Sequence, residues 1–124
     1  MRDSSTKPHR HLLVWQESIE LTMETYRTTK TYPAQERYNL VSQMQRCAAS
    51  VPANIAEGAA RQSAADFSRF LHIARGSLSE LDTHLEISRK LGYISPDVHR
   101  SLDSRIDPVG RLLTGLTKSL RPAS

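Results

Sequence analysis

The sequence predicts an all-α protein, an antiparallel up-down-up-down four-helix bundle, and three observations carry that prediction. Apolar residues recur at spacings of three and four along four long segments, which is the period of a helix with one buried face. Loops of two to five residues are expected between these segments, and short loops place consecutive long helices antiparallel. The alternating β-branched pattern that is typical of strands is almost absent.

The first helix is expected from about Leu13 to Thr31, and Tyr32-Pro33 ends it, because the residue before a proline disfavours the helical conformation. Residues 1–11 are polar and are expected to form a flexible tail, so residues 12–121 form a single domain. The predicted buried stripe of the first helix consists of its larger apolar residues: Leu12, Trp15, Ile19, Met23 and Tyr26.

The second helix is expected from about Ala34 to Arg61 and contains a proline in its middle. Pro52 has no N–H to offer the carbonyl of Ala48, and an interior proline destabilises a helix by about 3 kcal/mol. We expect the helix to kink there rather than stop, because its apolar stripe continues on both sides of the proline: Leu40, Met44, Cys47, Val51, Ile55 and Gly58.

The third helix is predicted to begin after Ser63, which resembles an N-cap with Asp66 three residues later. It continues to Leu91, and Gly92 suits a left-handed C-terminal cap. Gly76, within this helix, is expected to let a neighbouring helix approach closely. A heptad-like seam runs along the helix: Phe67, Leu71, Ala74, Leu78, Leu81, Leu85 and Ser88.

The fourth helix is predicted to start at Ser95-Pro96-Asp97, with serine as the cap, proline at the first helical position and an acidic first turn. Pro108 is expected to kink its second half. Its apolar stripe comprises Val98, Leu102, Ile106, Val109, Leu113, Leu116 and Leu120.

A second apolar stripe lies on the third helix, away from the seam. Ile73, Ile87 and Leu91 lie about 120–160° from the centre of the seam, and Phe70 flanks it. One interpretation is a wide core face with ordinary exposed apolar residues. The other is a subunit interface, in which two different patches meet head to tail around a ring.

Several ordered motifs resemble a bacterial four-helix-bundle family that is often encoded in intervening sequences of 23S ribosomal RNA genes. The strongest is Val51-Pro52-Ala53-Asn54-Ile55-Ala56-Glu57-Gly58, and the similarity extends over about residues 12–94. Other matching motifs are Leu13-Val14-Trp15-Gln16, Tyr32-Pro33-Ala34-Gln35-Glu36, Ile73-Ala74-Arg75-Gly76-Ser77 and Leu91-Gly92-Tyr93. The resemblance implies a small bundle that assembles into a ring-like homopentamer, and it implies no reaction. A more distant similarity is to the accessory protein of diversity-generating retroelements, which binds nucleic acid.

The formal charge is +4, and the chain has 13 arginines and 4 lysines. Arginine's planar guanidinium suits phosphate groups, so RNA is one possible partner. The alternative is an ordinary solvated surface. Candidate phosphate contacts are Arg46 and Arg61 on the second helix and Arg69 and Arg75 on the third.

A polar face of the second helix includes Asn54 and Glu57, both within the strongest motif. Three interpretations stay open: a solvated or ion-paired face, a hydrogen-bonded subunit interface, or a contact with a ligand or RNA. Glu57 and Arg61 are four apart, so a local ion pair accounts for those two residues.

The sequence indicates no enzyme, no cofactor and no metal site. It contains no Glu-x-x-His pair of the kind used by di-iron bundles and no Gly-rich phosphate loop. Glu80 and His84 are four apart but share the face of the second apolar stripe, and Cys47 is expected to be an inert core thiol. The amino terminus lacks the apolar core of a signal peptide, and no apolar run approaches the roughly 18 residues of a membrane span, so we expect a cytoplasmic protein.

Two functional hypotheses from different classes therefore remain. The first is a self-associating module that binds structured RNA or an RNA-associated protein. The second is a structural or partner-docking protein with no nucleic-acid role. Salt dependence separates them, because phosphate-dominated binding weakens steeply as salt rises and apolar docking does not.

Overall fold

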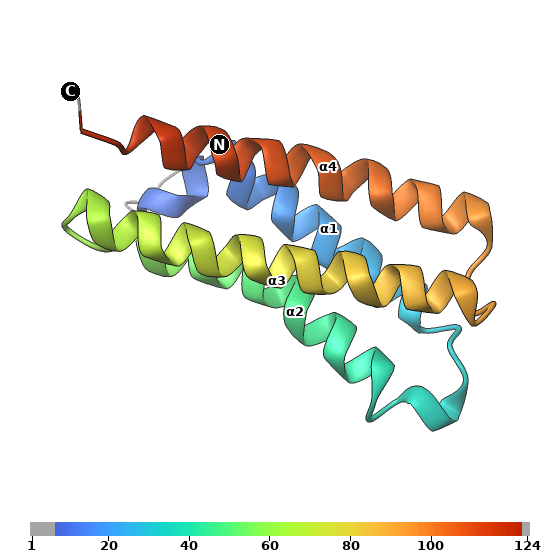
Figure 1. The fold of residues 1–124 in the computed structure, drawn as a ribbon. Coiled ribbons are helices and arrows are strands. Elements are labelled where there is room, and N and C mark those ends of the chain that lie inside the picture. The colour runs from blue at the N-terminus through green and yellow to red at the C-terminus, as the bar shows by residue number, and fades with distance from the viewer. Residues whose placement is uncertain (1–6, 123–124) are drawn as a thin grey trace, which may run out of the picture.

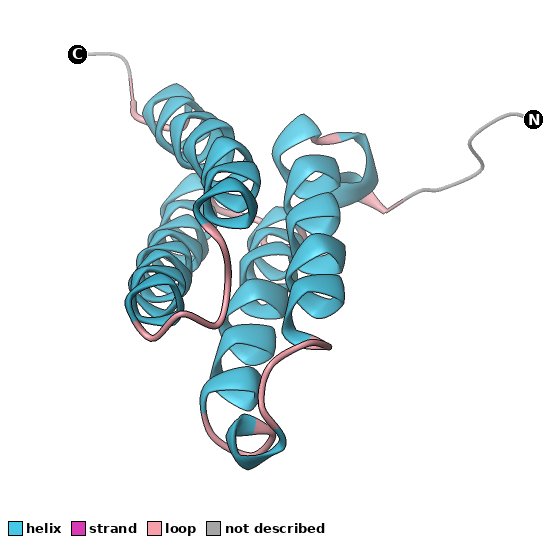
Figure 2. Ribbon diagram, turned by 90° about the vertical axis from the view of Figure 1, so that its right-hand side faces the viewer, coloured by secondary structure: helices cyan, strands magenta, loops and turns pink. Residues whose placement is uncertain are grey.

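The computed structural model describes residues 7–122, which form four long helices and two short 3₁₀ turns (Figure 1). The long helices are α1 (Leu13–Thr29), α2 (Leu40–Ala59), α3 (Ala64–Lys90) and α4 (Pro96–Ser119). Each packs against the helices before and after it in the chain, and α1 also packs against α4, whereas the backbones of the diagonal pairs do not come close. Figure 2 shows that the described chain is entirely helix and loop. The predicted antiparallel four-helix bundle is confirmed.

Most of the predicted helix ends are confirmed by the hydrogen bonds at the caps. The hydroxyl of Ser63 accepts the backbone N–H of Asp66, and that of Ser95 accepts the N–H of Val98, each at 3.1 Å. Gly92 has a positive φ of 79°, and the N–H of Tyr93 donates to the carbonyl of Ser88 at 3.0 Å. This last pairing is the Schellman motif, which closes the C-terminus of α3.

The connection between α1 and α2 differs from the prediction. The second helix begins at Leu40 rather than near Ala34, because only a 3₁₀ turn, η2 (Ala34–Glu36), and then a turn precede it. The loop over 30–39 is consequently longer than the expected two to five residues. The carboxylate of Glu36 accepts hydrogen bonds from Asn39 at 3.1 Å and from the hydroxyl of Tyr93 at 2.8 Å. These contacts hold the loop against the turn between α3 and α4.

The amino-terminal segment also differs from the expected tail in the part that the structure describes. Residues Pro8–His11 form a 3₁₀ turn, η1, which contacts α1 and α2. The ring of His9 lies 5.0 Å from that of Trp15, and the guanidinium of Arg10 lies 5.3 Å from the same indole. Residues 1–6 of the predicted tail lie outside the described residues.

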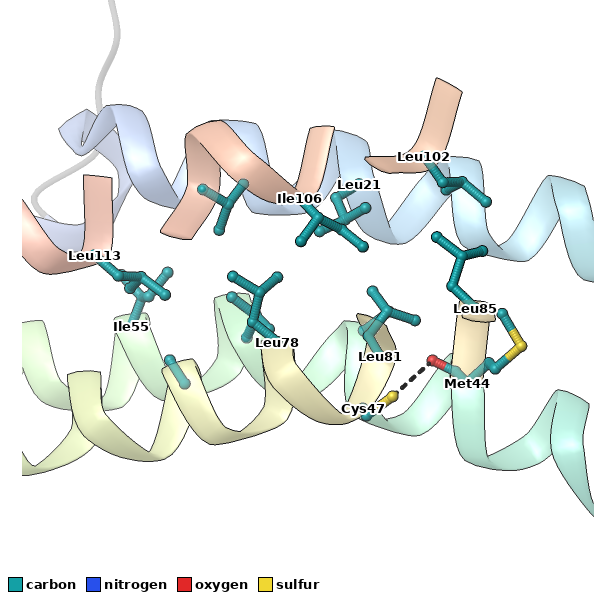
Figure 3. Packing of buried hydrophobic residues seen from close by; sticks show 14 of the residues in the cluster. Leu21, Met44, Cys47, Ile55, Leu78, Leu81, Leu85, Leu102, Ile106 and Leu113 are labelled. Carbon is teal, nitrogen blue, oxygen red and sulfur yellow. Dashed lines mark hydrogen bonds between the residues drawn. The ribbon is translucent and has the colours of Figure 1, made fainter. Parts of the chain in front are cut away.

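The core lies between the four helices, and α2, α3 and α4 contribute the residues that their patterns predicted (Figure 3). The predicted stripe of α2 is buried throughout, and the seam of α3 is buried from Leu71 to Ser88, with Phe67 half-buried. In α4 the centre of the stripe is buried, whereas Val98 is exposed and Thr117 is buried instead. None of the described helices combines the length and the apolar character that crossing a bilayer requires.

Most of the predicted core face of α1 is wrong, although Leu12 and Trp15 are half-buried and pack against the core. The buried residues are Val14, Ser18, Leu21, Thr25 and Thr29, about 120° around the helix from the expected stripe. Hydroxyl groups can be buried here because each donates to a carbonyl of its own helix: Ser18 to Trp15 at 2.8 Å, Thr25 to Leu21 at 2.9 Å and Thr29 to Thr25 at 2.9 Å. Met23 is 47% exposed and Tyr26 41% exposed as a consequence.

Pro52 lies within a continuous α2, as predicted, and Figure 1 shows that the axis of this helix bends in its middle. The carbonyl of Ala48, which Pro52 cannot pair, accepts the hydroxyl of Thr22 from α1 at 3.1 Å. The same hydroxyl lies 2.8 Å from the carbonyl of Ser18 and shares its proton between the two oxygens. A neighbouring helix thus satisfies the acceptor that proline leaves unpaired.

Glycine at position 58 lets α2 and α3 approach closely. A Cβ at this position would lie 2.9 Å from the Cδ1 atom of Phe67 and 2.9 Å from the Cβ of Phe70. Gly76, which was expected to play that role, has nothing within 4 Å of its Cβ position. The residue that permits close approach is therefore on α2, whereas Gly76 lies on an open face of the described chain.

Candidate functional site

A groove of about 740 Å³ runs between α3 and α4 and gathers most of its charged side chains from α4. Arg75, Arg111 and Lys118 are exposed, and none of their side chains forms an ion pair or hydrogen bond within the described part of the chain. The whole lining consists of Arg75, Leu78, Ser79, Asp82, Ile106, Asp107, Gly110, Arg111, Thr114, Gly115 and Lys118.

The charges in this groove are segregated along its length. Leu78 lies opposite Gly110, since a Cβ there would be 3.5 Å from its Cδ2 atom. The helices are antiparallel, so Arg75 lies at the end with Lys118, and Asp82 lies at the other end near Asp107. Burial, and then the neighbouring carboxylate of Asp103, raise the pKa of Asp82. One end of the groove is therefore suited to an anion and the other is not.

The four arginines proposed from the sequence do not form one cluster. Arg61 and Arg69 both lie over the ring of Phe70, with guanidinium carbons 4.8 and 4.5 Å from its centroid. Arg61 also pairs with Glu57 at 2.9 Å, and Arg69 approaches Asp66 at 3.7 Å.

The other two arginines lie elsewhere. Arg46 donates to the hydroxyl of Ser42 at 2.9 Å on the outer side of α2. Only Arg75 lines the α3–α4 groove.

Sequence reasoning missed Arg111 and Lys118. The helical period places both on one polar face of α4, because they are seven residues apart. That signal alone does not say which neighbouring helix the face adjoins. Their proximity to Arg75 becomes visible only once α3 and α4 are placed side by side.

The polar face of α2 is largely explained by contacts within the chain. The amide of Asn54 donates to the carbonyl and to the hydroxyl of Ser50, at 2.8 and 2.9 Å. The hydroxyls of Ser50 and Ser77 lie 2.8 Å apart and join α2 to α3. Glu57 forms the expected ion pair with Arg61. These hydrogen bonds favour a structural role for Asn54.

The second apolar stripe of α3 lies on the surface of the single chain. Ile73 is 43%, Ile87 42% and Leu91 56% exposed, whereas Phe70 is half-buried under the two arginines. Met23 and Tyr26 form a second exposed apolar area on α1. The monomer thus presents two different apolar faces on two different helices.

Cys47, Glu80 and His84 come together, a grouping that no sequence pattern predicted. Their ligating atoms all lie within 4.8 Å of one another. Burial and then the charge of Glu80 raise the pKa of the Cys47 thiol to about 11, so at neutral pH it is protonated and a weak nucleophile. This trio contains residue types that bind transition metals.

Comparison with known proteins places these features in a family. The family model described as 23S rRNA-intervening sequence protein matches residues 10–115. A crystal structure of a protein of unknown function from the S23 ribosomal protein family of Bacteroides thetaiotaomicron is 27% identical, with a TM-score of 0.77. The similarity covers 86% of this chain and 99% of that one. No curated protein matches the chain.

Proposed function

Because the chain belongs to the family of 23S rRNA-intervening sequence proteins, we propose that it is a non-enzymatic, self-associating module that binds structured RNA. The binding surface is the basic end of the α3–α4 groove, formed by Arg75, Arg111 and Lys118. The observation that carries the proposal is that these three cationic side chains line the same groove and form no ion pair within the described chain. Cations of this kind pair readily with phosphate oxygens, and arginine offers them two parallel hydrogen bonds.

The groove is a better candidate than the Phe70 cluster of Arg61 and Arg69. Both arginines of the cluster already have carboxylate neighbours, and breaking those contacts offsets part of what a phosphate would contribute. Arg75 and Arg111 form no such ion pair within the described residues. Phosphate contacts carry no base information, so we expect binding that depends on shape and charge rather than sequence.

Charge reversal in two matched pairs tests the groove. Arg75→Glu with Arg111→Glu should weaken binding to unrelated RNA hairpins by a similar factor and lower the salt slope by about one per lost contact. Arg61→Glu with Arg69→Glu changes the net charge equally and should have the smaller effect. Fluorescence anisotropy over a salt series measures both, with circular dichroism as the control for folding.

Two results would contradict this function. Equal loss in both double variants would mean that general charge, rather than the groove, attracts RNA. No affinity of the wild-type protein for RNA at low salt would favour the structural or partner-docking alternative, for which the exposed apolar faces are the supporting observation.

We also propose that the protein is a homo-oligomer, a ring of five subunits, in which the α3 stripe of one copy meets the Met23–Tyr26 face of α1 in the next. Two different complementary patches are what a head-to-tail ring requires. A ring would repeat the basic groove, and repeated weak contacts raise the overall affinity through effective concentration.

Sedimentation equilibrium tests this assembly. A 14.0 kDa species for the wild-type protein at micromolar concentration would contradict it. Ile87→Glu and Met23→Glu should each release folded monomers, because burying an unpaired charge is strongly unfavourable. A mixture of the two variants should form a heterodimer, since each keeps the patch that the other lacks. A two-fold interface in which the α3 stripes of two copies pair with each other would give no such rescue.

A further inference from the structure

Three side chains that commonly ligate metals meet where α2 packs against α3. Glu80 and His84 stand one turn apart on α3, with the Nε2 atom of His84 3.4 Å from the Oε2 atom of Glu80. Cys47 faces them from α2. The ligating atoms of all three residues lie within 4.8 Å of one another.

The surroundings of these atoms leave part of their bonding capacity unused. The Nδ1 atom of His84 is buried and has no hydrogen-bond partner in the described chain. A buried nitrogen without a hydrogen-bond partner is unfavourable unless something else binds it. The Cys47 sulfur is also buried, and its thiol donates a hydrogen bond to the carbonyl of Met44 at 3.4 Å (Figure 3). Glu80 is exposed and leaves an entry path from solvent.

We propose that Cys47, Glu80 and His84 form a binding site for a divalent transition metal ion of the zinc class. Thiolate, imidazole and carboxylate are the three donor types that zinc accepts, at about 2.0–2.3 Å. Tetrahedral ligands at those lengths are roughly 3.5 Å apart. The Oε2 atom of Glu80 and the Nε2 atom of His84 already have that separation, at 3.4 Å, and the Cys47 sulfur lies within 4.8 Å of the other two ligating atoms. On binding, the Cys47 thiol releases its proton to solvent and the sulfur bonds the metal as thiolate.

The donor set selects the class of metal. Magnesium and calcium prefer oxygen ligands throughout, whereas a thiolate favours zinc, cobalt or copper. Three protein ligands leave one tetrahedral position open. A cavity of about 380 Å³ adjoins the site and is lined by Cys47 and Glu80 together with Arg46, Ser50 and Ser77. This cavity offers room for a water or a small anion at the open position.

Titration of the full-length protein with Co²⁺ tests the site, because a cobalt–thiolate bond gives a charge-transfer absorption that imidazole and carboxylate do not. The wild-type protein should show this band, and Zn²⁺ should abolish it by displacement. Cys47→Ser should lose the band, and His84→Gln should weaken Co²⁺ binding by more than about 100-fold, beyond what loss of an outer hydrogen bond does. His72→Gln, an exposed histidine on the same helix, is the matched control and should behave as wild type.

The amino-terminal histidines provide the second control, since His9 and His11 could bind metal by themselves. The double variant His9→Gln, His11→Gln should keep the charge-transfer band and the affinity. Zn²⁺ should also raise the melting temperature of wild type but not of His84→Gln, because only a protein that binds the ion is stabilised by it. Absence of the band in wild-type protein, or an unchanged affinity in folded His84→Gln, would overturn the proposal.

Discussion

The two long interfaces of α3 differ in how closely they are packed. Against α2, the helix makes the most extensive interface of the bundle, with Gly58 admitting Phe67 and Phe70 and with Ser50 bonded to Ser77. Against α4, it leaves a charged groove of about 740 Å³. The same helix therefore uses one side for close packing and leaves the other accessible.

Glycine illustrates the difference. Gly58 removes a side chain that would clash, so two helices come together. Gly110 and Gly115 border the α3–α4 groove, where a Cβ would meet at most an ordinary contact or nothing within 4 Å. A glycine inside a helix permits close helix packing only if a bulky side chain of the neighbouring helix fills the space that a Cβ would occupy. Otherwise the missing side chain widens the groove between the helices. Four substitutions test this comparison, beginning with the largest expected loss of stability and ending with the one expected gain, each measured by urea denaturation at a fixed protein concentration.

Leu81→Ala should have the largest effect, a loss of about 2–5 kcal/mol in the free energy of unfolding. Leu81 is buried in the middle of the seam, so its removal leaves a cavity. Leu78→Ala is the matched variant: Leu78 borders the groove, where solvent and neighbours can relax into the space, so the loss should be smaller. An equal loss would mean that the two sides of α3 are equally well packed.

Gly58→Ala should be destabilising overall. Overpacking is expected to lower the free energy of unfolding by about 1–3 kcal/mol, and the higher helix propensity of alanine offsets about 1 kcal/mol of that loss. The new methyl group would clash with the side chain of Phe67 and lie 3.2 Å from its carbonyl, and backbone relaxes poorly. The melting temperature and the urea midpoint of the variant should both fall below those of the wild-type protein. A more stable variant would show that α2 and α3 separate easily, contrary to the comparison.

Thr22→Val should destabilise by about 1–3 kcal/mol, because it leaves the buried carbonyl of Ala48 without a donor. In a Pro52→Ala background, the new N–H at position 52 can bond that carbonyl, so the same change should be milder by at least about 0.5 kcal/mol. A double-mutant cycle measures this coupling. Pro52→Ala alone should impair packing or assembly more than its gain in helix propensity helps. If the effects of Thr22→Val and Pro52→Ala simply add, the Thr22 hydroxyl does not replace the hydrogen bond that Pro52 cannot donate.

Gly115→Ala should have the smallest effect and the opposite sign, stabilising by up to about 1 kcal/mol. The position is exposed and its Cβ would meet nothing within 4 Å, so the propensity gain is unopposed. Together with Gly58→Ala it forms a matched pair: the same substitution, in two helices, with opposite outcomes. Destabilisation of both would indicate that α4 packs more tightly than the groove implies.

Much of the fold was predictable because its determinants are local. The caps at Ser63 and Ser95 and the turn at Gly92 depend on atoms within a few residues, so their sequence patterns predict them well. The start of α2 was not predictable in this way, because Glu36 is held by Tyr93 from a distant turn. The core face of α1 was also missed, since short hydroxyl residues can be buried once their own helix satisfies them.

The candidate sites were only partly predictable. The sequence placed Arg75 on an outer face of α3 as a candidate phosphate contact and Ile73, Ile87 and Leu91 on a second apolar stripe, since each position follows from the period of one helix. It could not identify Arg111 and Lys118 as neighbours of Arg75, or Cys47 as a neighbour of His84. Those pairs join residues on different helices, and periodicity within one helix contains no information about its rotation against another.

By itself, the sequence determined the helices, most of their ends, and the buried sides of α2, α3 and α4, because the 3.6-residue period and near-neighbour hydrogen bonds are properties of one segment. Only the tertiary structure decided which side of α1 faces the core, where the helices touch closely and where they part. The physical reason is that burial depends on the partner: Gly58 and Gly115 are the same residue, yet one meets a phenylalanine and the other meets open space.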